Sequence, residues 1–169
     1  MKTMAIVCEY NPFHNGHHYQ IAVQKEELRC ENVICVMSGN FVQRGDAAIC
    51  DKWTRAKMAL SCGCDLVIEL PVVYATQSAE RFAFGAVALI DQLNIVDYLS
   101  FGSECGDITS LSNVADTILD YSFKNILHQS LKNGDSYPKA RANTLEMLLG
   151  REKCEIINQP NNILAIEYI

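Results

Sequence analysis

The sequence has no excess of positive charge and no long hydrophobic run. Its 14 lysines and arginines are outnumbered by 20 aspartates and glutamates, which gives a net charge of −6. The composition therefore excludes a broad basic surface, and any contact with RNA must come from a local patch. No apolar stretch approaches the ~20 residues of a membrane-spanning helix, so no membrane association is expected. The amino terminus also lacks the small-residue cleavage site of a secretory signal, which predicts a cytoplasmic protein.

Aromatic residues are few as well, at 8% of the chain, with a single tryptophan. Cysteine is more frequent, and without a secretory signal its eight copies are expected to be reduced thiols. Cys62 and Cys64 form the only close pair in the sequence. No second pair stands at zinc-ligand spacing, so no metal site is predicted. Cys8, Cys35 and Cys50 lie in apolar stretches, where they are expected to behave as small core residues.

Short apolar runs alternate with amphipathic segments, first as strand-like and then as helix-like sequence. Strands are predicted at 3–9, 33–37, 66–70 and 98–101, with helices at 17–28, 52–62 and 77–93 between them. This alternation predicts an α/β fold, a Rossmann-like open parallel sheet with crossover helices and strands buried on both faces. Only helices follow: 110–120, 123–132, 137–149 and, after a connector at 151–160, 163–169, with Asn161 and Asn162 as its N-cap. One domain over residues 1–169 is expected.

The stretch Ala5–Tyr19 joins the first strand to the first helix. It contains His14 and His17 on either side of Gly16, directly after a turn-forming Asn-Pro pair. At the carboxyl edge of a parallel sheet, such a seam is where ligands usually bind, and a helix N-terminus attracts anions. The two imidazoles can therefore converge on phosphate oxygens, and the glycine permits close approach of the ligand. The alternative is a pair of surface histidines, which is the interpretation we favour for His18 and His128.

Several strings of this sequence resemble one enzyme family. His-Asn-Gly-His matches the H-x-G-H signature that nucleotidyltransferases share with class I aminoacyl-tRNA synthetases. The longer string E-Y-N-P-F-H-N-G-H (9–17) resembles the opening signature of the bacterial tRNA(Met) cytidine acetate ligases. The matching strings that follow it are M-S-G-N-F-V-Q-R-G-D (37–46), the helix from K-W (52–53) to K-M-A (57–59), D-L-V-I-E-L-P (65–71), F-G-S-E (101–104) and P-N-N-I-L (160–164).

This resemblance implies a reaction and a set of ligands. Such enzymes use ATP to convert acetate to acetyl-adenylate and pyrophosphate, and then acetylate the wobble cytidine of elongator tRNA(Met). It implies that His14 and His17 are catalytic and that Mg²⁺ accompanies the ATP. Gly102 and Asn162, or alternatively Asn161, are expected near the ribose and adenine. The remaining residues expected to line the ATP site are Val7, Cys8, Glu9, Tyr10, Asn11, Pro12, Phe13, Asn15, Gly16, His18, Tyr19 and Gln20.

Other polar residues follow the predicted strands or begin the second helix. Gly39, Arg44, Lys52 and Lys57 are candidates for contacts with acetate, phosphate or RNA, and each charged one has the alternative of being a solvated surface group. Lys52, Arg55 and Lys57 form the clearest basic cluster in the sequence. Three further residues keep two interpretations: Trp53 stacks on a base or packs on its helix, and Glu69 and Glu104 orient a ligand or cap a neighbouring helix.

One expected element is missing from these residues. Enzymes of this superfamily carry a late serine- and threonine-rich motif with an arginine that grips the triphosphate, and no S-x-S-x-x-R occurs here. We therefore expect a truncated chain that lacks full activity alone, with most tRNA contacts outside it. Two other functions remain open. One is a small-molecule nucleotidyltransferase that transfers AMP from ATP to a phosphorylated metabolite, and the other is a nucleotide-binding module without activity.

Overall fold

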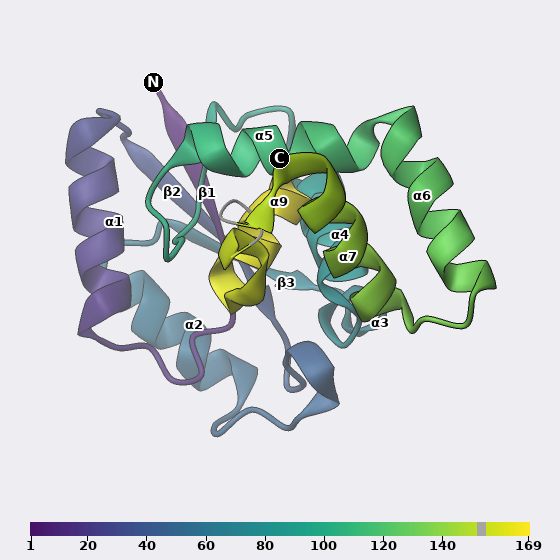
Figure 1. Cartoon of the computed structure of the whole chain (residues 1–169). Coiled ribbons are helices and arrows are strands. Elements are labelled where there is room, and N and C mark those ends of the chain that lie inside the picture. The colour runs from purple at the N-terminus through teal and green to yellow at the C-terminus, as the bar shows by residue number, and fades with distance from the viewer. Residues whose placement is uncertain (152–154) are drawn as a thin grey trace. The chain divides into compact units, whose positions relative to one another are not determined.

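A four-stranded parallel sheet organises the first part of the chain. The computed structural model describes residues 1–151 and 155–169, and the chain forms two compact units, Met1–Phe101 and Gly102–Ile169. The sheet lies in the first unit with the order β3-β2-β1-β4 (Figure 1). Its strands are β1 (Thr3–Cys8), β2 (Asn32–Ser38), β3 (Leu66–Leu70) and β4 (Tyr98–Ser100). The predicted α/β fold with an open parallel sheet is confirmed.

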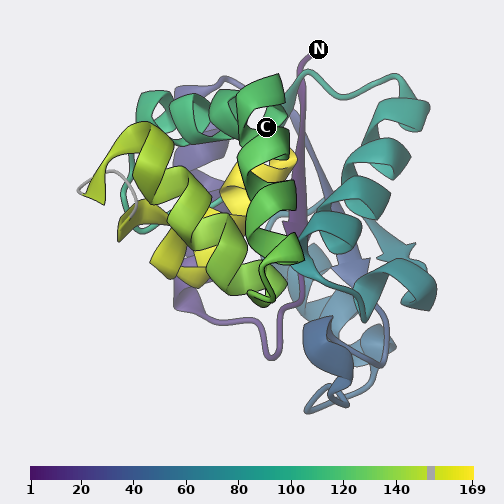
Figure 2. The same ribbon diagram turned by 45° about the vertical axis from the view of Figure 1, so that its right-hand side comes forward.

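Helices cover both faces of this sheet. The helical elements of the first unit are α1 (Asn15–Glu27), η1 (Gln43–Gly45), α2 (Lys52–Ser61), α3 (Val72–Ala75) and α4 (Ala79–Leu93). α1 and α2 pack on one face through Ile21 and Ala59, and Figure 2 shows α4 on the other. The short helix α3 was not predicted, because four residues are too few to show a helical period.

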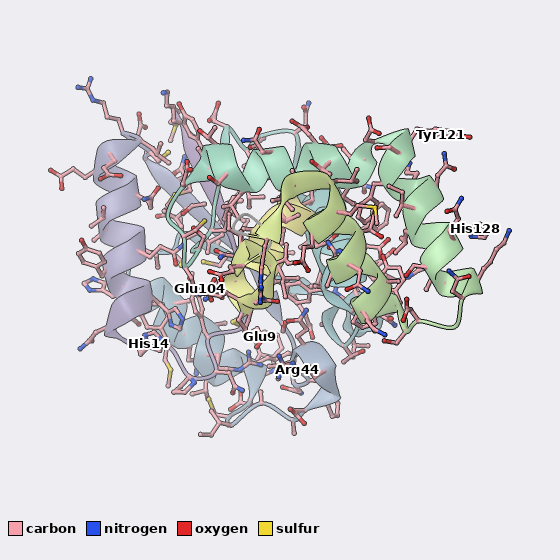
Figure 3. All side chains as sticks on the ribbon, viewed as in Figure 1. Glu9, His14, Arg44, Glu104, Tyr121 and His128 are labelled. Carbon is pink, nitrogen blue, oxygen red and sulfur yellow. The ribbon has the colours of Figure 1, made fainter. Side chains whose placement is uncertain are left out.

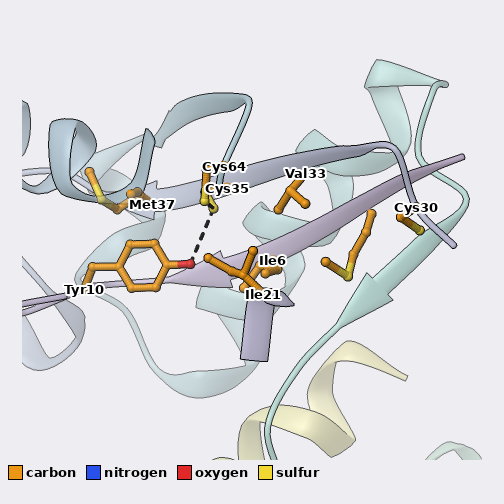
Figure 4. Close-up of a cluster of buried hydrophobic side chains, with 10 residues drawn as sticks. Ile6, Tyr10, Ile21, Cys30, Val33, Cys35, Met37 and Cys64 are labelled. Carbon is orange, nitrogen blue, oxygen red and sulfur yellow. Dashed lines mark hydrogen bonds between the residues drawn. The ribbon is translucent and has the colours of Figure 1, made fainter. Parts of the chain in front are cut away.

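The core between the sheet and α1 and α2 is built by strand alternation. Met4 and Ile6 of β1 point to the same face as Cys35 and Met37 of β2 (Figure 4). Tyr10, which follows the end of β1, also belongs to this cluster, and its hydroxyl lies 3.4 Å from the Cys35 sulfur. Burial of such side chains stabilises the unit by roughly 1.5–3 kcal/mol each. The core prediction is correct for Cys35, whereas Cys8 and Cys50 are only partly buried.

β3 departs from the prediction that every strand is buried on both faces. Its first residue, Leu66, is 45% exposed, and Glu69 is exposed too. The reason is its place in the sheet: β3 pairs only with β2 and forms one edge. Continuous hydrophobic runs predict a buried parallel strand but do not distinguish a central strand from an edge strand.

The second unit is helical. Its elements are α5 (Ile108–Leu119), α6 (Tyr121–Lys132), α7 (Tyr137–Leu149), η2 (Glu155–Asn158) and α9 (Pro160–Tyr168). α6 ends at Lys132, and Gly134, with a φ of 94°, follows its end. The N-cap of α9 is Gln159 and its first residue is Pro160, so the predicted cap at Asn161 and Asn162 is wrong. Residues 152–154 of the predicted connector lie outside the described residues.

No helix among residues 1–151 and 155–169 combines the length and the apolar character needed to cross a bilayer.

Candidate nucleotide-binding site

The segment that joins β1 to α1 lies beside the point where the strand order reverses. In the order β3-β2-β1-β4, this switch falls between β1 and β4. Ligands of open α/β sheets bind in the crevice outside the carboxyl ends of the strands at such a point. Gln20 of α1 donates a hydrogen bond to the hydroxyl of Ser100 at the end of β4, at 3.3 Å. This bond holds the first helix across the end of that crevice.

Two histidines form the N-cap of α1 together. His14, labelled in Figure 3, is the N-cap residue. Its Nδ1 accepts a hydrogen bond from the Gly16 amide at 3.1 Å. In return, Nδ1 of His17 accepts one from the His14 amide at 3.2 Å. This reciprocal pair is a capping box with imidazoles in place of the usual hydroxyl and carboxylate. The helix begins at Asn15, two residues before the predicted start, because sequence periodicity does not detect a histidine cap.

The cap determines which ring atoms are available to a ligand. A nitrogen that accepts a main-chain N–H carries no proton, so both neutral imidazoles hold their proton on Nε2. The rings stack at a centroid distance of 3.6 Å, with 21° between their planes. The cap thus fixes two parallel Nε2–H donors side by side at the carboxyl edge of the sheet. Gly16 matters for the same geometry, since a Cβ there would lie only 3.0 Å from the His14 ring.

His17 is held in its neutral form. Its ring packs against Tyr10 and Phe13 at centroid distances of 4.8 and 5.4 Å. Burial, followed by the charge of the neighbouring His14, lowers the pKa of His17 from 6.5 to about 4. At neutral pH it therefore acts as a hydrogen-bond donor without a charge.

This pKa predicts a pH dependence of folding. The unfolded chain binds a proton at His17 below pH 6.5, whereas the folded chain does so only near pH 4. The stability contributed by neutral His17 is therefore complete above pH 6.5 and is lost as the pH falls toward 4. NMR titration of the His17 ring should give a midpoint near pH 4, and His14→Gln should raise it by removing the neighbouring charge. A midpoint at 6.5 in the intact protein would contradict the assigned burial of the ring.

Glu9 and Asn11, expected to line the ATP site, use their side chains to hold the loop that follows β2. The Glu9 carboxylate accepts the Gln43 amide at 2.7 Å, and Asn11 Oδ1 accepts the Ile49 amide at 2.7 Å. The loop is further closed by a bridge between Phe41 and Ala47. These bonds fix the loop to the segment that carries the histidines. Contact of Glu9 and Asn11 with ATP remains a prediction.

Arg44 lies at the tip of this loop. Its backbone has a φ of 76°, in the left-handed region that side chains other than glycine rarely adopt, and its side chain is exposed. Such a conformation costs about 1–3 kcal/mol and is found preferentially at ligand-binding positions. The loop therefore carries an exposed guanidinium.

Gly39 and Lys52 converge on Glu69 at the ends of β2 and β3. A Cβ at Gly39 would meet the Glu69 carboxylate, so a larger residue there would displace this exposed side chain. Lys52 forms an ion pair with it at 2.6 Å and lies over the exposed ring of Trp53 at 5.4 Å. Lys57 is exposed on the same helix as Lys52. The structure thus gives Glu69 a lysine partner, while the role of both lysines toward a ligand remains a prediction.

Arg55 was assigned to a surface basic cluster, and this interpretation is wrong. Its side chain is completely buried and its guanidinium donates only to main-chain carbonyls. The acceptors are those of Cys50 at 3.2 Å, Glu9 at 2.5 Å, Ser38 at 3.0 Å and Gly39. Arg55 therefore joins the carboxyl ends of β1 and β2 to the start of α2. Arg55 and Lys57 are two residues apart, so the helix turns them about 200° from each other and Arg55 faces inward where Lys57 faces solvent.

Ser38 is a polar residue that sequence reasoning missed. It ends β2, is fully buried, and its hydroxyl finds no hydrogen-bond partner within the described residues. No motif signals it, since a serine beside a glycine at a strand end is ordinary turn sequence.

Gly102 and Asn162 belong to the second unit, where Asn162 fixes a loop. Its Oδ1 accepts the amides of Glu104 and Cys105 at 2.9 and 3.2 Å, and its Nδ2 donates to the Ile156 carbonyl. Glu104 returns the contact by accepting the Asn161 and Asn162 amides, which confirms its interpretation as a helix cap. These amide hydrogen bonds outweigh burial and lower the pKa of Glu104. Gly102 is exposed, with open space where a Cβ would lie. Contacts of Gly102 and Asn162 with ATP remain predictions.

The other expected ATP-site residues continue the same segment. Val7 and Cys8 end β1, Pro12 follows a cis peptide bond, and Asn15, His18 and Tyr19 are exposed at the start of α1. A separate cavity of about 380 Å³ in the first unit is lined by residues at the end of α4 and the start of β4, and none of the predicted site residues lines it. No cluster of three or more His, Cys, Asp or Glu side chains able to hold a metal occurs in the described part of the chain.

Comparison with known families shows which family this chain belongs to. The model of the HIGH Nucleotidyl Transferase family matches residues 1–169, which is the whole chain. The chain belongs to the HIGH nucleotidyl transferase family. His14 and His17 belong to the H-x-G-H string that this sequence shares with nucleotidyltransferases.

Similar members of the HIGH nucleotidyl transferase family share one name. The chain is 52% identical to tRNA(Met) cytidine acetate ligase from Thermoanaerobacter sp. (strain X514), over 100% of its own length and 43% of that protein. It is 50% identical to the protein of the same name from Clostridium perfringens (strain ATCC 13124), over 99% of its length and 44% of that protein. The chain thus spans less than half the length of these relatives.

A solved structure has the same fold. Thermotoga maritima TmcAL bound with alpha-thio ATP superposes with a TM-score of 0.93 at 45% identity, covering 100% of this chain and 42% of the other.

Proposed function

We propose that this chain carries the ATP-dependent step of a tRNA(Met) cytidine acetate ligase. In this reaction, ATP and acetate give acetyl-adenylate and pyrophosphate, and the acetyl group then passes to the exocyclic amine of the wobble cytidine of elongator tRNA(Met), releasing AMP. The observation that carries the proposal is the fixed pair of Nε2–H donors at the strand-order switch. The names of the relatives and the ATP analogue in the Thermotoga maritima structure support the choice of substrates.

The first step is a displacement at the α-phosphorus. A carboxylate oxygen of acetate attacks in line, a new P–O bond forms, and the bond to the pyrophosphate oxygen breaks. Negative charge builds up on the leaving pyrophosphate. His14 and His17 can donate their Nε2–H groups to its oxygens, and Mg²⁺ is proposed to arrive with the triphosphate and to share this charge. Because the donors are already fixed by the cap, they need no rearrangement as the charge develops.

The neutral state of His17 suits this role. A neutral imidazole keeps its Nδ1 on the His14 amide and its proton on Nε2, so the donor stays aimed while the phosphate binds. The exposed Arg44 is proposed to hold the acetate carboxylate or a phosphate from the adjoining loop. Lys52 and Lys57 are proposed as weaker contacts to phosphate or RNA. Because elongator tRNA(Met) is the proposed substrate, we propose that the reaction takes place in the cytoplasm.

The experiment that tests the proposal is acetate-dependent ATP–pyrophosphate exchange with the full-length protein and Mg²⁺. We expect exchange with acetate in the absence of tRNA, and acetylation of tRNA(Met) once it is added. Turnover with a nucleotide-like phosphate substrate and none with acetate would instead identify a small-molecule nucleotidyltransferase. Calorimetric binding of ATP without either activity would identify a non-catalytic module.

A further inference from the structure

The solvent-facing side of α6 carries basic side chains and no carboxylate. The helix, Tyr121–Lys132, contains Lys124, His128 and Lys132 but no aspartate or glutamate. The chain as a whole has 20 acidic and 14 basic residues. α2 also lacks acidic residues, but its Lys52 is paired with Glu69 and its Arg55 is buried.

Helical geometry gathers the polar side chains of α6 on one side. At 100° per residue, the residues that fall within about one third of the circumference are Tyr121, Lys124, Asn125, His128 and Lys132. All five are exposed, and Tyr121 is 78% exposed. Figure 3 shows Tyr121 and His128 projecting outward from the helix. Buried Phe123 lies on the opposite side. We call these five residues the α6 face.

Nearby carboxylates do not neutralise this face. Asp120 is the N-cap of α6 and is occupied by the amide and hydroxyl of Ser122. Beyond the carboxyl end, Asp135 pairs with Lys139 at 2.7 Å and accepts the Ser130 hydroxyl. Neither Lys124 nor Lys132 forms an ion pair within residues 1–151 and 155–169. Their ammonium groups are available to an external anion.

We propose that the α6 face binds the sugar-phosphate backbone of the tRNA substrate, an inference that rests on the proposed function. Lys124, His128 and Lys132 follow one another at intervals of four residues, about 6 Å along the helix axis. Three donors in a row match a chain of successive phosphates. The exposed ring of Tyr121 offers a surface for a base, and the Asn125 amide can bond to a ribose hydroxyl.

Charge reversal tests this surface. Lys124→Glu/Lys132→Glu is compared with Arg29→Glu/Arg81→Glu, which reverses two exposed cations outside α6 and changes the net charge equally. Binding of fluorescent tRNA(Met) to the purified protein is measured by polarisation over a series of salt concentrations. We expect the α6 variant to bind about tenfold more weakly or worse, with a salt slope shallower by about 1.4–1.8. The control should stay within about twofold of the unmodified protein.

Four further results test the α6 face. Tyr121→Ala should weaken binding about fivefold while leaving the salt slope unchanged, because stacking releases no counterions. An equal loss of tRNA binding in both charge-reversal variants would show that only net charge matters, and would overturn the proposal for the α6 face. Unchanged tRNA binding in the α6 variant, with acetate-dependent pyrophosphate exchange intact, would overturn the face while leaving the proposed function standing. Loss of that exchange in the unmodified protein is a failure of the proposed function instead.

Discussion

His17→Ala is expected to lower the rate of acetate-dependent ATP–pyrophosphate exchange by about a hundredfold or more. That loss corresponds to ~3 kcal/mol of transition-state stabilisation, the usual cost of removing one fixed donor to a developing oxyanion. The reason is the capping box. The His14 amide donates to Nδ1 of His17 at 3.2 Å, and this bond fixes the direction in which the Nε2–H of His17 points. A water molecule that took the place of the His17 ring would not have its donor fixed in that way. The measurement is kcat and KM for ATP in the exchange reaction.

A second substitution at the same position separates catalysis from structure. Glutamine at the third position of a helix can return a side-chain oxygen to the N-cap amide, as it does in ordinary capping boxes. His17→Gln should therefore keep the cap and the stability of α1 but still lose the exchange activity. His17→Ala also loses the bond from the His14 amide, which is one half of the capping box, while His14 still accepts the Gly16 amide. Full activity in His17→Gln would show that His17 serves only to cap the helix.

The strands, the helices and the histidine seam were predictable because each has a local signal. Apolar runs bounded by glycine and proline predicted the sheet, and two histidines around Gly16 marked the end of β1. The distribution of caps was not predictable in the same way. Expectation placed an asparagine cap before α9, but the proline at position 160 starts that helix and Glu104 supplies the capping carboxylate from a distant loop. Long-range partners of this kind leave no pattern in the sequence.

Arg55 shows a second limit of sequence reasoning. Charge favours a surface position, and three cations on one helix read as a basic patch. The structure turns one of them inward, because the carbonyls at the ends of two neighbouring strands need donors that the sheet no longer provides. A guanidinium with five N–H groups can satisfy several of them at once, which an ammonium or an amide cannot. The ends of β1 and β2, which lead into the segments with the proposed ligand contacts, thus depend on the buried side chain of Arg55.

Arg55→Met is expected to reduce the free energy of unfolding by about 3 kcal/mol or more, enough to unfold much of a marginally stable protein. Methionine fills a similar volume but leaves the carbonyls of Glu9, Ser38, Gly39 and Cys50 without their donor. Each buried carbonyl left unpaired costs roughly 1–3 kcal/mol. Methionine also removes the cost of burying a charge, and this gain offsets part of the loss. Urea denaturation followed by circular dichroism measures the loss.

Lys57→Met is the matched control for this prediction. It removes a cation two residues away on the exposed side of α2 and should change stability by about 0.5 kcal/mol or less. Arg55→Lys keeps the charge but loses the fork of donors, so we expect intermediate stability and a folded protein. In that variant the end of β1 loses part of its support, and the KM for ATP should rise because the segment carrying His14 and His17 follows directly. Equal stability of Arg55→Met and the unmodified protein would mean that the buried charge costs as much as its four acceptors contribute.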